Sequence, residues 1–137
     1  MRSEGVIRHY SEIEPKDWPW DNFAPREIAC KHCGQVYYWP DFMDRLQALR
    51  DDVAQPMNIT SGHRCRLHNA RVGGAPQSQH LRLAVDVDLS GHNRIEIARK
   101  AKKHGFSGFG FYQSFLHLDL GRLRQWFGGI RSRRSWE

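Results

Sequence analysis

His80, Asp86 and His117 have side chains of the types that bind metal ions. Two neutral imidazoles and one carboxylate form a set that often holds catalytic zinc, with a fourth position left for water. Zinc held in this way lowers the pKa of the water towards about 7 and polarises a carbonyl group, which suits hydrolysis of an amide bond. The three residues are far apart in the chain, so a fold must bring them together.

The elements that would position these residues are strands. Residues 84–89 alternate small or apolar side chains with Asp86 and Asp88, and this period of two predicts a strand with both aspartates on one face. His80 lies just before this strand. His117 falls in a later pair of strands, so the candidate ligands come from separate elements.

Prolines, glycines and apolar spacing predict the other elements. A helix that begins at Pro40 has one apolar face, and Pro56 ends it. The order of elements indicates an α+β fold with a small antiparallel sheet flanked by helices. The remaining expected elements are a short helix at 25–29, a tight turn at 30–34, a strand at 57–61, a long loop at 63–79 with a helical turn near His68, a helix at about 93–104 capped by Ser90, and strands at about 108–112 and 115–120.

Length and charge limit the class of protein. A chain of 137 residues fits one domain, which we expect to span 23–127 between an N-terminal arm (1–22) and a basic C-terminal tail (128–137). The net charge of +6 favours polyanions, but no nucleic-acid reading motif is present and we expect no nucleic-acid partner. We expect neither a transmembrane segment nor a signal peptide, hence synthesis in the cytoplasm; if the protein works outside the cytoplasm, another route must deliver it.

Several short motifs occur in a fixed order between Phe23 and Gly121. They are Phe23-Ala24-Pro25-Arg26-Glu27, Leu46-Gln47-Ala48-Leu49-Arg50, Ser61-Gly62-His63-Arg64, His68-Asn69, Val72-Gly73-Gly74-Ala75, Ser78-Gln79-His80, Ala84-Val85-Asp86, Gly108-Phe109-Gly110-Phe111-Tyr112 and Phe115-Leu116-His117-Leu118-Asp119. Together they resemble the zinc D-Ala-D-Ala carboxypeptidase and endopeptidase family of peptidoglycan peptidases. This family includes phage endolysins and tail-associated wall hydrolases, and the hedgehog signalling domain is a more distant relative.

The resemblance implies a role for each motif residue. His80, Asp86 and His117 would be the zinc ligands, and Arg64 would lie near a substrate carboxylate or the scissile carbonyl. The implied activity is zinc-dependent hydrolysis of D-Ala-containing bonds in peptidoglycan, by a carboxypeptidase or a cross-link endopeptidase, in phage-type wall degradation. The implied partners are the peptidoglycan stem peptide and, for a virion-mounted protein, phage tail or particle proteins. The alternative is a binding or structural module of a phage tail or particle with weakened catalysis.

Three positions depart from the family pattern. Five residues separate His80 from Asp86 where relatives usually have six, so Asp88 remains an alternative ligand. His63 stands where the family has tyrosine. Ser114 stands where some relatives carry a glutamate base, so another group must accept the proton of the water.

Several roles stay open in the sequence. Asp119 lies two residues beyond His117 on the same strand face, about 7 Å along. It is equally suited to act as the general base and to accept the N–H of a ligand histidine, and His63 is a third candidate for the base. Ser78 either binds substrate or fixes its loop. Tyr112 either lines the cleft or joins the core.

The three cysteines allow three states. Cys30 and Cys33 form a C-x-x-C pair, and Cys65 stands alone. All three could be reduced thiols, or one of the pair could form a disulfide with Cys65 after release into an oxidising space. They could also hold a second, structural zinc ion if His32, His63 or His68 completed the site.

Overall fold

Two sheets organise the computed structural model, which describes residues 2–137. The smaller sheet pairs β1 (Gly5–Ile7) with β2 (Val36–Tyr38) in antiparallel fashion. The larger sheet has the order β3-β4-β6-β5-β7, in which only β5 and β7 are parallel among the pairs of the described chain. Its strands are β3 (Ile59–Ser61), β4 (Val85–Asp88), β5 (Gly108–Phe111), β6 (Phe115–Asp119) and β7 (Arg124–Phe127).

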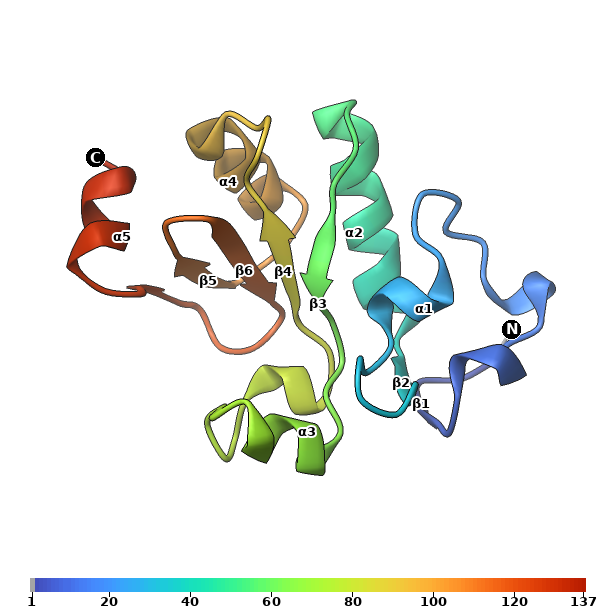
Figure 1. Cartoon of the computed structure of the whole chain (residues 1–137). Helices are drawn as coiled ribbons and strands as arrows, with labels where there is room; N and C mark the ends of the chain where they lie inside the picture. The colour runs from blue at the N-terminus through green and yellow to red at the C-terminus, as the bar shows by residue number, and fades with distance from the viewer. Residues whose placement is uncertain (1) are drawn as a thin grey trace.

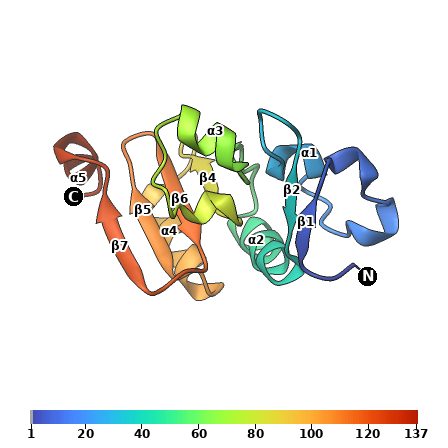
Figure 2. The same ribbon diagram turned by 90° about the horizontal axis from the view of Figure 1, so that it is seen from below.

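Helices α2 and α4 cover one face of the larger sheet, while α3 lies on the other side (Figures 1 and 2). The α-helices are α1 (Pro25–Ile28), α2 (Pro40–Val53), α3 (Arg66–Arg71), α4 (Arg94–Lys103) and α5 (Ile130–Ser135). Three short 3-10 helices complete the set: η1 (Tyr10–Glu12), η2 (Pro15–Asp17) and η3 (Gln79–Leu81). None of the helices within residues 2–137 is long and apolar enough to cross a bilayer.

The core lies between the sheet and α2 with α4. Strand alternation sends Val85 and Val87 of β4, and Leu116 and Leu118 of β6, into this core, where each is fully buried. Each such side chain contributes about 1.5–3 kcal/mol to stability. The same alternation turns the residues between them towards the opposite face, which is where the candidate ligands lie.

The α+β class with small sheets and flanking helices, expected from the sequence, is confirmed. The helix at 93–104 begins differently from the expectation. Its cap is Asn93, whose side chain accepts the Glu96 N–H, and not Ser90. The strands β1, β2 and β7 were not expected. β7 lies beside β5 without a hairpin, and no local turn signal could indicate this parallel pairing.

The two terminal segments join the body of the molecule. In the N-terminal arm, Trp20 is buried and donates its indole N–H to Asp44 on α2 at 2.8 Å. The segment expected to be a basic tail instead forms α5, at the end of the chain in Figure 1. Trp136 packs on Phe111 with ring centroids 4.8 Å apart and donates to the Tyr112 carbonyl at 2.8 Å. The large apolar ring of Trp136 packs this segment against the sheet. The many arginines around it in the sequence make the segment look like a solvated tail.

Candidate metal centre

His80, Asp86 and His117 meet on the sheet face opposite the core. Asp86 of β4 and His117 of β6 are directly opposite each other in the strand register. His80, on η3, approaches from the loop side. One donor atom from each residue lies within 4.8 Å of the other two, and all three residues are buried. Asp86 Oδ1 lies 3.3 Å from His80 Nε2 and 3.0 Å from His117 Nδ1. The fold therefore brings together the three residues expected to hold zinc.

A backbone carbonyl holds the ring of His80. The His80 Nδ1 donates to the Gly62 carbonyl oxygen at 2.7 Å, because a carbonyl can only accept. This bond leaves the Nε2 lone pair directed at Asp86. Ser78 fixes the same turn, since its Oγ accepts the His80 backbone N–H at 3.1 Å.

A carboxylate two residues further along the same strand holds the ring of His117. The His117 Nε2 donates to Asp119 Oδ2 at 2.7 Å, while Nδ1 faces Asp86. Asp119 is fully buried and receives two further bonds from Arg124, at 2.8 and 2.7 Å, and one from the Gly121 N–H at 2.9 Å. Gly108 makes room for this pair, because a Cβ there would lie 1.9 Å from Asp119 Oδ1.

These contacts keep both carboxyl groups ionised. Burial raises the pKa of Asp86, but hydrogen bonds from His117 and His80 outweigh it and bring the pKa down to about 2. Burial also raises the pKa of Asp119, and hydrogen bonds from His117, Arg124 and the Gly121 N–H bring it well below its usual range. Burial lowers the pKa of His117, yet its bonds to Asp119 and Asp86 leave it above the ordinary value. The carboxylates of Asp86 and Asp119 on either side of the His117 ring give this part of the site a negative charge that attracts a cation.

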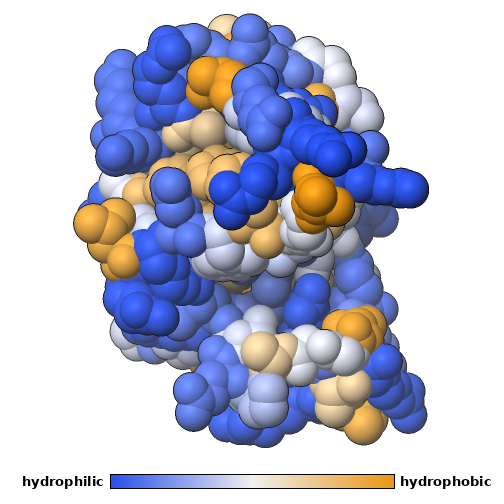
Figure 3. All heavy atoms as spheres, turned by 90° about the vertical axis from the view of Figure 1, so that its left-hand side faces the viewer, coloured by the Kyte–Doolittle hydropathy of each residue, from blue (hydrophilic) through white to orange (hydrophobic). Residues whose placement is uncertain are grey.

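An open pocket of about 730 Å³ lies over the three residues. Figure 3 shows the molecule hollowed on this side, above the lower lobe to which α3 belongs in Figure 1. This volume is in the range of small-ligand sites. The pocket is lined by Arg64, Gly73, Gly74, Ala75, Gln77, Ser78, Gln79, His80, Asp86, Tyr112, Phe115, His117, Arg122, Arg124 and Trp126.

The residues predicted to bind substrate line this pocket. Arg64 lies beside the glycine-rich loop and donates to Asn69 Oδ1 at 3.3 Å. Ser78 lines the pocket and also fixes η3. Tyr112 forms part of the wall, where its hydroxyl accepts the Trp126 indole N–H at 2.9 Å.

Three other candidates lie elsewhere. Asp88 ends β4, away from the cluster, and accepts the Ser90 N–H at 3.0 Å, so Asp86 takes the ligand position. The ring of His63 is bound to the Arg82 carbonyl at 2.6 Å and to Gln35 at 2.8 Å, outside the pocket. Asp119 lies behind His117 and does not line the pocket.

Two residues of β7 belong to the site and were missed in the sequence. Arg124 binds Asp119, and the Trp126 ring lies 5.1 Å from the His117 ring. Gly110 allows this approach, since a Cβ there would lie 2.7 Å from the Trp126 ring. The basic excess near the C-terminus contained Arg124 but did not distinguish it from the other arginines.

Two imidazoles and one carboxylate with lone pairs converging at an open pocket fit zinc, and each histidine has an outer acceptor of the kind that orients ligands. The site is therefore of the class found in mononuclear zinc hydrolases. The family described as peptidase M15 matches residues 21–119, well over half of the chain, and the chain belongs to this family. Its members are zinc metallopeptidases that act on peptidoglycan-type substrates. No match was found among curated proteins.

Proposed function

We propose that this protein hydrolyses D-Ala-containing peptide bonds of peptidoglycan, as a carboxypeptidase or a cross-link endopeptidase. The observation that carries the proposal is the convergence of His80 Nε2, Asp86 Oδ1 and His117 Nδ1 at the floor of an open pocket. The motif resemblance to peptidoglycan peptidases supports this choice of substrate. We further propose, from the same resemblance, that the protein acts in the periplasm or cell wall in phage-type wall degradation.

His80, Asp86 and His117 would hold a zinc ion, which would supply an activated water molecule and polarise the scissile carbonyl. The chain itself keeps the donors in place. The Gly62 carbonyl and Asp119 hold the outer nitrogens of the two histidines, so the inner nitrogens stay directed at the pocket. Asp86 is ionised at neutral pH because its pKa is about 2. The donor set therefore needs little rearrangement to accept a divalent cation.

Asp119 acts in this proposal as a positioning residue. Its oxygens are taken up by His117, Arg124 and the Gly121 N–H, and it has no exposed surface. A general base must reach the proton that it removes. Of the two roles open in the sequence, we assign Asp119 the acceptor role, in which it fixes the tautomer of His117.

The walls of the pocket suit an anionic peptide. Arg64 and Arg122 lie at its rim, and Arg122 is exposed. Either guanidinium can pair with a carboxylate of the stem peptide through two parallel hydrogen bonds. Tyr112 and Trp126 also line the pocket and offer aromatic surface that can contact the methyl groups of alanine residues. Charge and apolar surface thus both favour an Ala-rich peptide with a free carboxylate.

One observation favours a second candidate function, a module that binds this peptide with weakened catalysis. Among the described residues that line the pocket, Asp86 is the only carboxylate, and it is part of the ligand set. Ser114 stands where some relatives carry the glutamate base. Without a base beside the water, proton transfer would lose an acceleration of about 10²–10⁴.

Digestion of defined muropeptides with and without a chelator, followed by mass spectrometry of the products, tests the proposal. We expect release of D-Ala or of new free amines by the wild-type protein, and loss of this release with the chelator. His117→Ala should be inactive. His104→Ala is the matched control, because this ring pairs with Asp52 outside the pocket and its loss should leave the activity intact. Zinc-dependent binding without product would favour the second candidate, and neither binding nor product would overturn both.

A further inference from the structure

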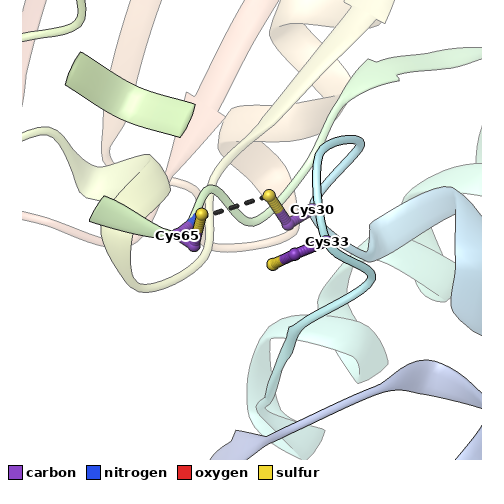
Figure 4. A group of neighbouring side chains, drawn as sticks. All are labelled: Cys30, Cys33 and Cys65. Atoms are coloured by element: carbon purple, nitrogen blue, oxygen red, sulfur yellow. Dashed lines mark hydrogen bonds between the residues drawn. The ribbon is translucent and has the colours of Figure 1, made fainter. Parts of the chain in front are cut away.

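A second cluster of metal-binding side chains lies outside the pocket. The sulfur atoms of Cys30, Cys33 and Cys65 all lie within 4.8 Å of one another, and none is in a disulfide. Figure 4 shows the three thiol groups turned towards a common space, between the turn after α1 and the segment that begins α3. Tetrahedral zinc with bonds of about 2.3 Å holds its sulfur ligands about 3.8 Å apart. The cluster would need to close by about 1 Å at most.

The backbone around Cys30 is arranged to stabilise a thiolate. The Cys65 N–H donates to the Cys30 sulfur at 3.4 Å, and the N–H groups of Cys33 and His32 also point at it. Backbone N–H groups directed at a sulfur in this way stabilise a thiolate, which is the form that binds a metal ion. Gly34, with φ of 80°, and its N–H bond to the Cys30 carbonyl at 2.9 Å close the turn.

The imidazole of His32 lies beside one of the three sulfurs, that of Cys65. The His32 Nδ1 lies 3.7 Å from the Cys65 sulfur, close to the separation of about 3.6 Å between nitrogen and sulfur ligands of tetrahedral zinc. The His68 ring stacks on His32 with centroids 6.0 Å apart. Arg71 lies 3.2 Å from the His32 Nε2 and would have to turn away, because that nitrogen carries the proton when Nδ1 binds a metal. Arg71 is exposed and free to do so.

We propose that Cys30, Cys33 and Cys65 bind a second, structural zinc ion, with His32 in the fourth position. Three thiolates and one imidazole around zinc carry a net charge of −1, and the chain places a cation, Lys31, between two of the proposed ligands in the sequence. All four positions are then filled by protein, as in closed structural sites, so this ion has no place for substrate or water. The proposal does not depend on the proposed peptidase activity.

The second zinc ion would hold one side of the catalytic site in place. Residues 62–65 lie between the two clusters. At one end the Gly62 carbonyl and the Arg64 N–H bind His80, and at the other end Cys65 caps α3 and joins the cysteine cluster. Zinc would tie this segment to the turn after α1, a connection that otherwise rests on contacts such as the His63 N–H bond to the Ile28 carbonyl at 2.8 Å. This consequence, unlike the site itself, rests on the proposed function.

Zinc content and cobalt spectroscopy of the full chain test the proposal. We expect two zinc ions per chain in the wild type, one in Cys33→Ser, one in His117→Ala and none in the double variant. After exchange with Co²⁺, the wild type and His117→Ala should show thiolate-to-cobalt charge-transfer absorption in the near ultraviolet, and Cys33→Ser should not. This band comes from the cysteine cluster alone, because the other site has no sulfur ligand.

The fourth ligand has its own matched pair of variants. His32→Ala should release zinc from the cysteine cluster at least tenfold faster than the wild type, and His68→Ala should not. The reverse result would overturn the assignment of His32.

The two sites fail in different ways. Suppose that the wild type holds one zinc ion per chain and shows no cobalt–thiolate band, and that Cys33→Ser retains this ion while His117→Ala loses it. This result would overturn the second site and leave the proposed function standing. A disulfide found by mass spectrometry in freshly purified protein would also overturn it. The cobalt spectrum of the wild type alone shows whether thiolates bind the metal. The second site can therefore be tested even if one of the variants does not fold.

Discussion

His80, Asp86 and His117 lie on or beside paired strands, whereas Cys30, Cys33 and Cys65 lie on turns and at a helix start. In the strand-based cluster the register places Asp86 opposite His117, and each histidine has a second partner that holds its outer nitrogen. In the cysteine cluster the Cys30 sulfur accepts backbone N–H groups of its turn and of Cys65, and the Cys65 sulfur accepts the His68 N–H. One site is thus organised by the sheet before any metal binds, whereas at the proposed second site a metal ion would strengthen the connection between two segments that hydrogen bonds already join.

This difference separates the two roles. A catalytic site must keep its donor geometry while substrates enter and leave, and outer-sphere hydrogen bonds on rigid strands provide that. A structural site stabilises the fold by closing a chain loop, and it gains most where the segments are otherwise loosely connected. The three predictions below test this contrast, in order of decreasing effect.

The exchange of one carboxylate on β4 should have the largest effect. Asp86→Asn is expected to lose zinc from the strand-based cluster and to lower kcat/KM by about 10³-fold or more, which corresponds to several kcal/mol of transition-state stabilisation. Asp88→Asn is the matched control, since Asp88 is two residues away and accepts the Ser90 N–H outside the metal cluster. Zinc analysis and muropeptide kinetics check both variants. Zinc loss in the Asp88 variant together with retention in the Asp86 variant would contradict the assignment.

The outer partner of His117 should have an intermediate effect. Asp119→Asn is expected to lower zinc affinity or activity by about 10–100-fold, because the asparagine no longer fixes the His117 tautomer as an anion does. Arg124→Gln should produce a similar change, since Arg124 holds Asp119 in place. Activity measured as a function of zinc concentration separates the two roles of Asp119. If Asp119 only positions His117, excess zinc should restore most of the activity of the variant. If Asp119 is the general base, the activity should stay low at saturating zinc.

The strand-based cluster could be predicted from the sequence for physical reasons. Alternation around Asp86 and in the 115–120 strand indicates both the strands and the face that each side chain occupies. The motif order then selected His80, Asp86 and His117 from the eight histidines and fifteen acidic residues. Alternation alone does not distinguish Asp86 from Asp88 as the ligand, because both side chains lie on the same face of the strand. The register of β4 against β6 makes that choice.

Other parts could not be predicted because they depend on contacts between distant segments. β7 pairs in parallel with β5, and Arg124-Gln125-Trp126-Phe127 has no clear alternation, so neither its strand nor its part in the site was visible. The sequence left three states open for the cysteines. They meet because the end of α1 packs against Gly62, where a Cβ would lie 2.5 Å from the Ile28 carbonyl oxygen.

An exposed ion pair also connects the N-terminal part of the chain to the segment beside His80. Its loss should have the smallest effect of the three changes, a small decrease in the free energy of unfolding. Arg82, two residues after His80, binds Glu4 at 2.6 Å and the Tyr37 hydroxyl at 3.1 Å. Both side chains are substantially exposed, so Glu4→Gln should lower the free energy of unfolding by about 1 kcal/mol or less. Hydrogen bonds from Tyr37 and Arg82 lower the pKa of Glu4.

That direction sets the pH dependence of the comparison between wild type and Glu4→Gln. A carboxyl group with a lowered pKa in the folded protein stabilises it above the ordinary value of about 4.3, and this contribution is lost as the pH falls through the lowered value. The difference in free energy of unfolding should therefore be present at pH 7 and shrink below about pH 4. Urea unfolding at the two pH values measures it. A difference of several kcal/mol at pH 7 would show that the N-terminal part depends on this pair, and not on a metal-bound cysteine cluster, for its attachment to the site.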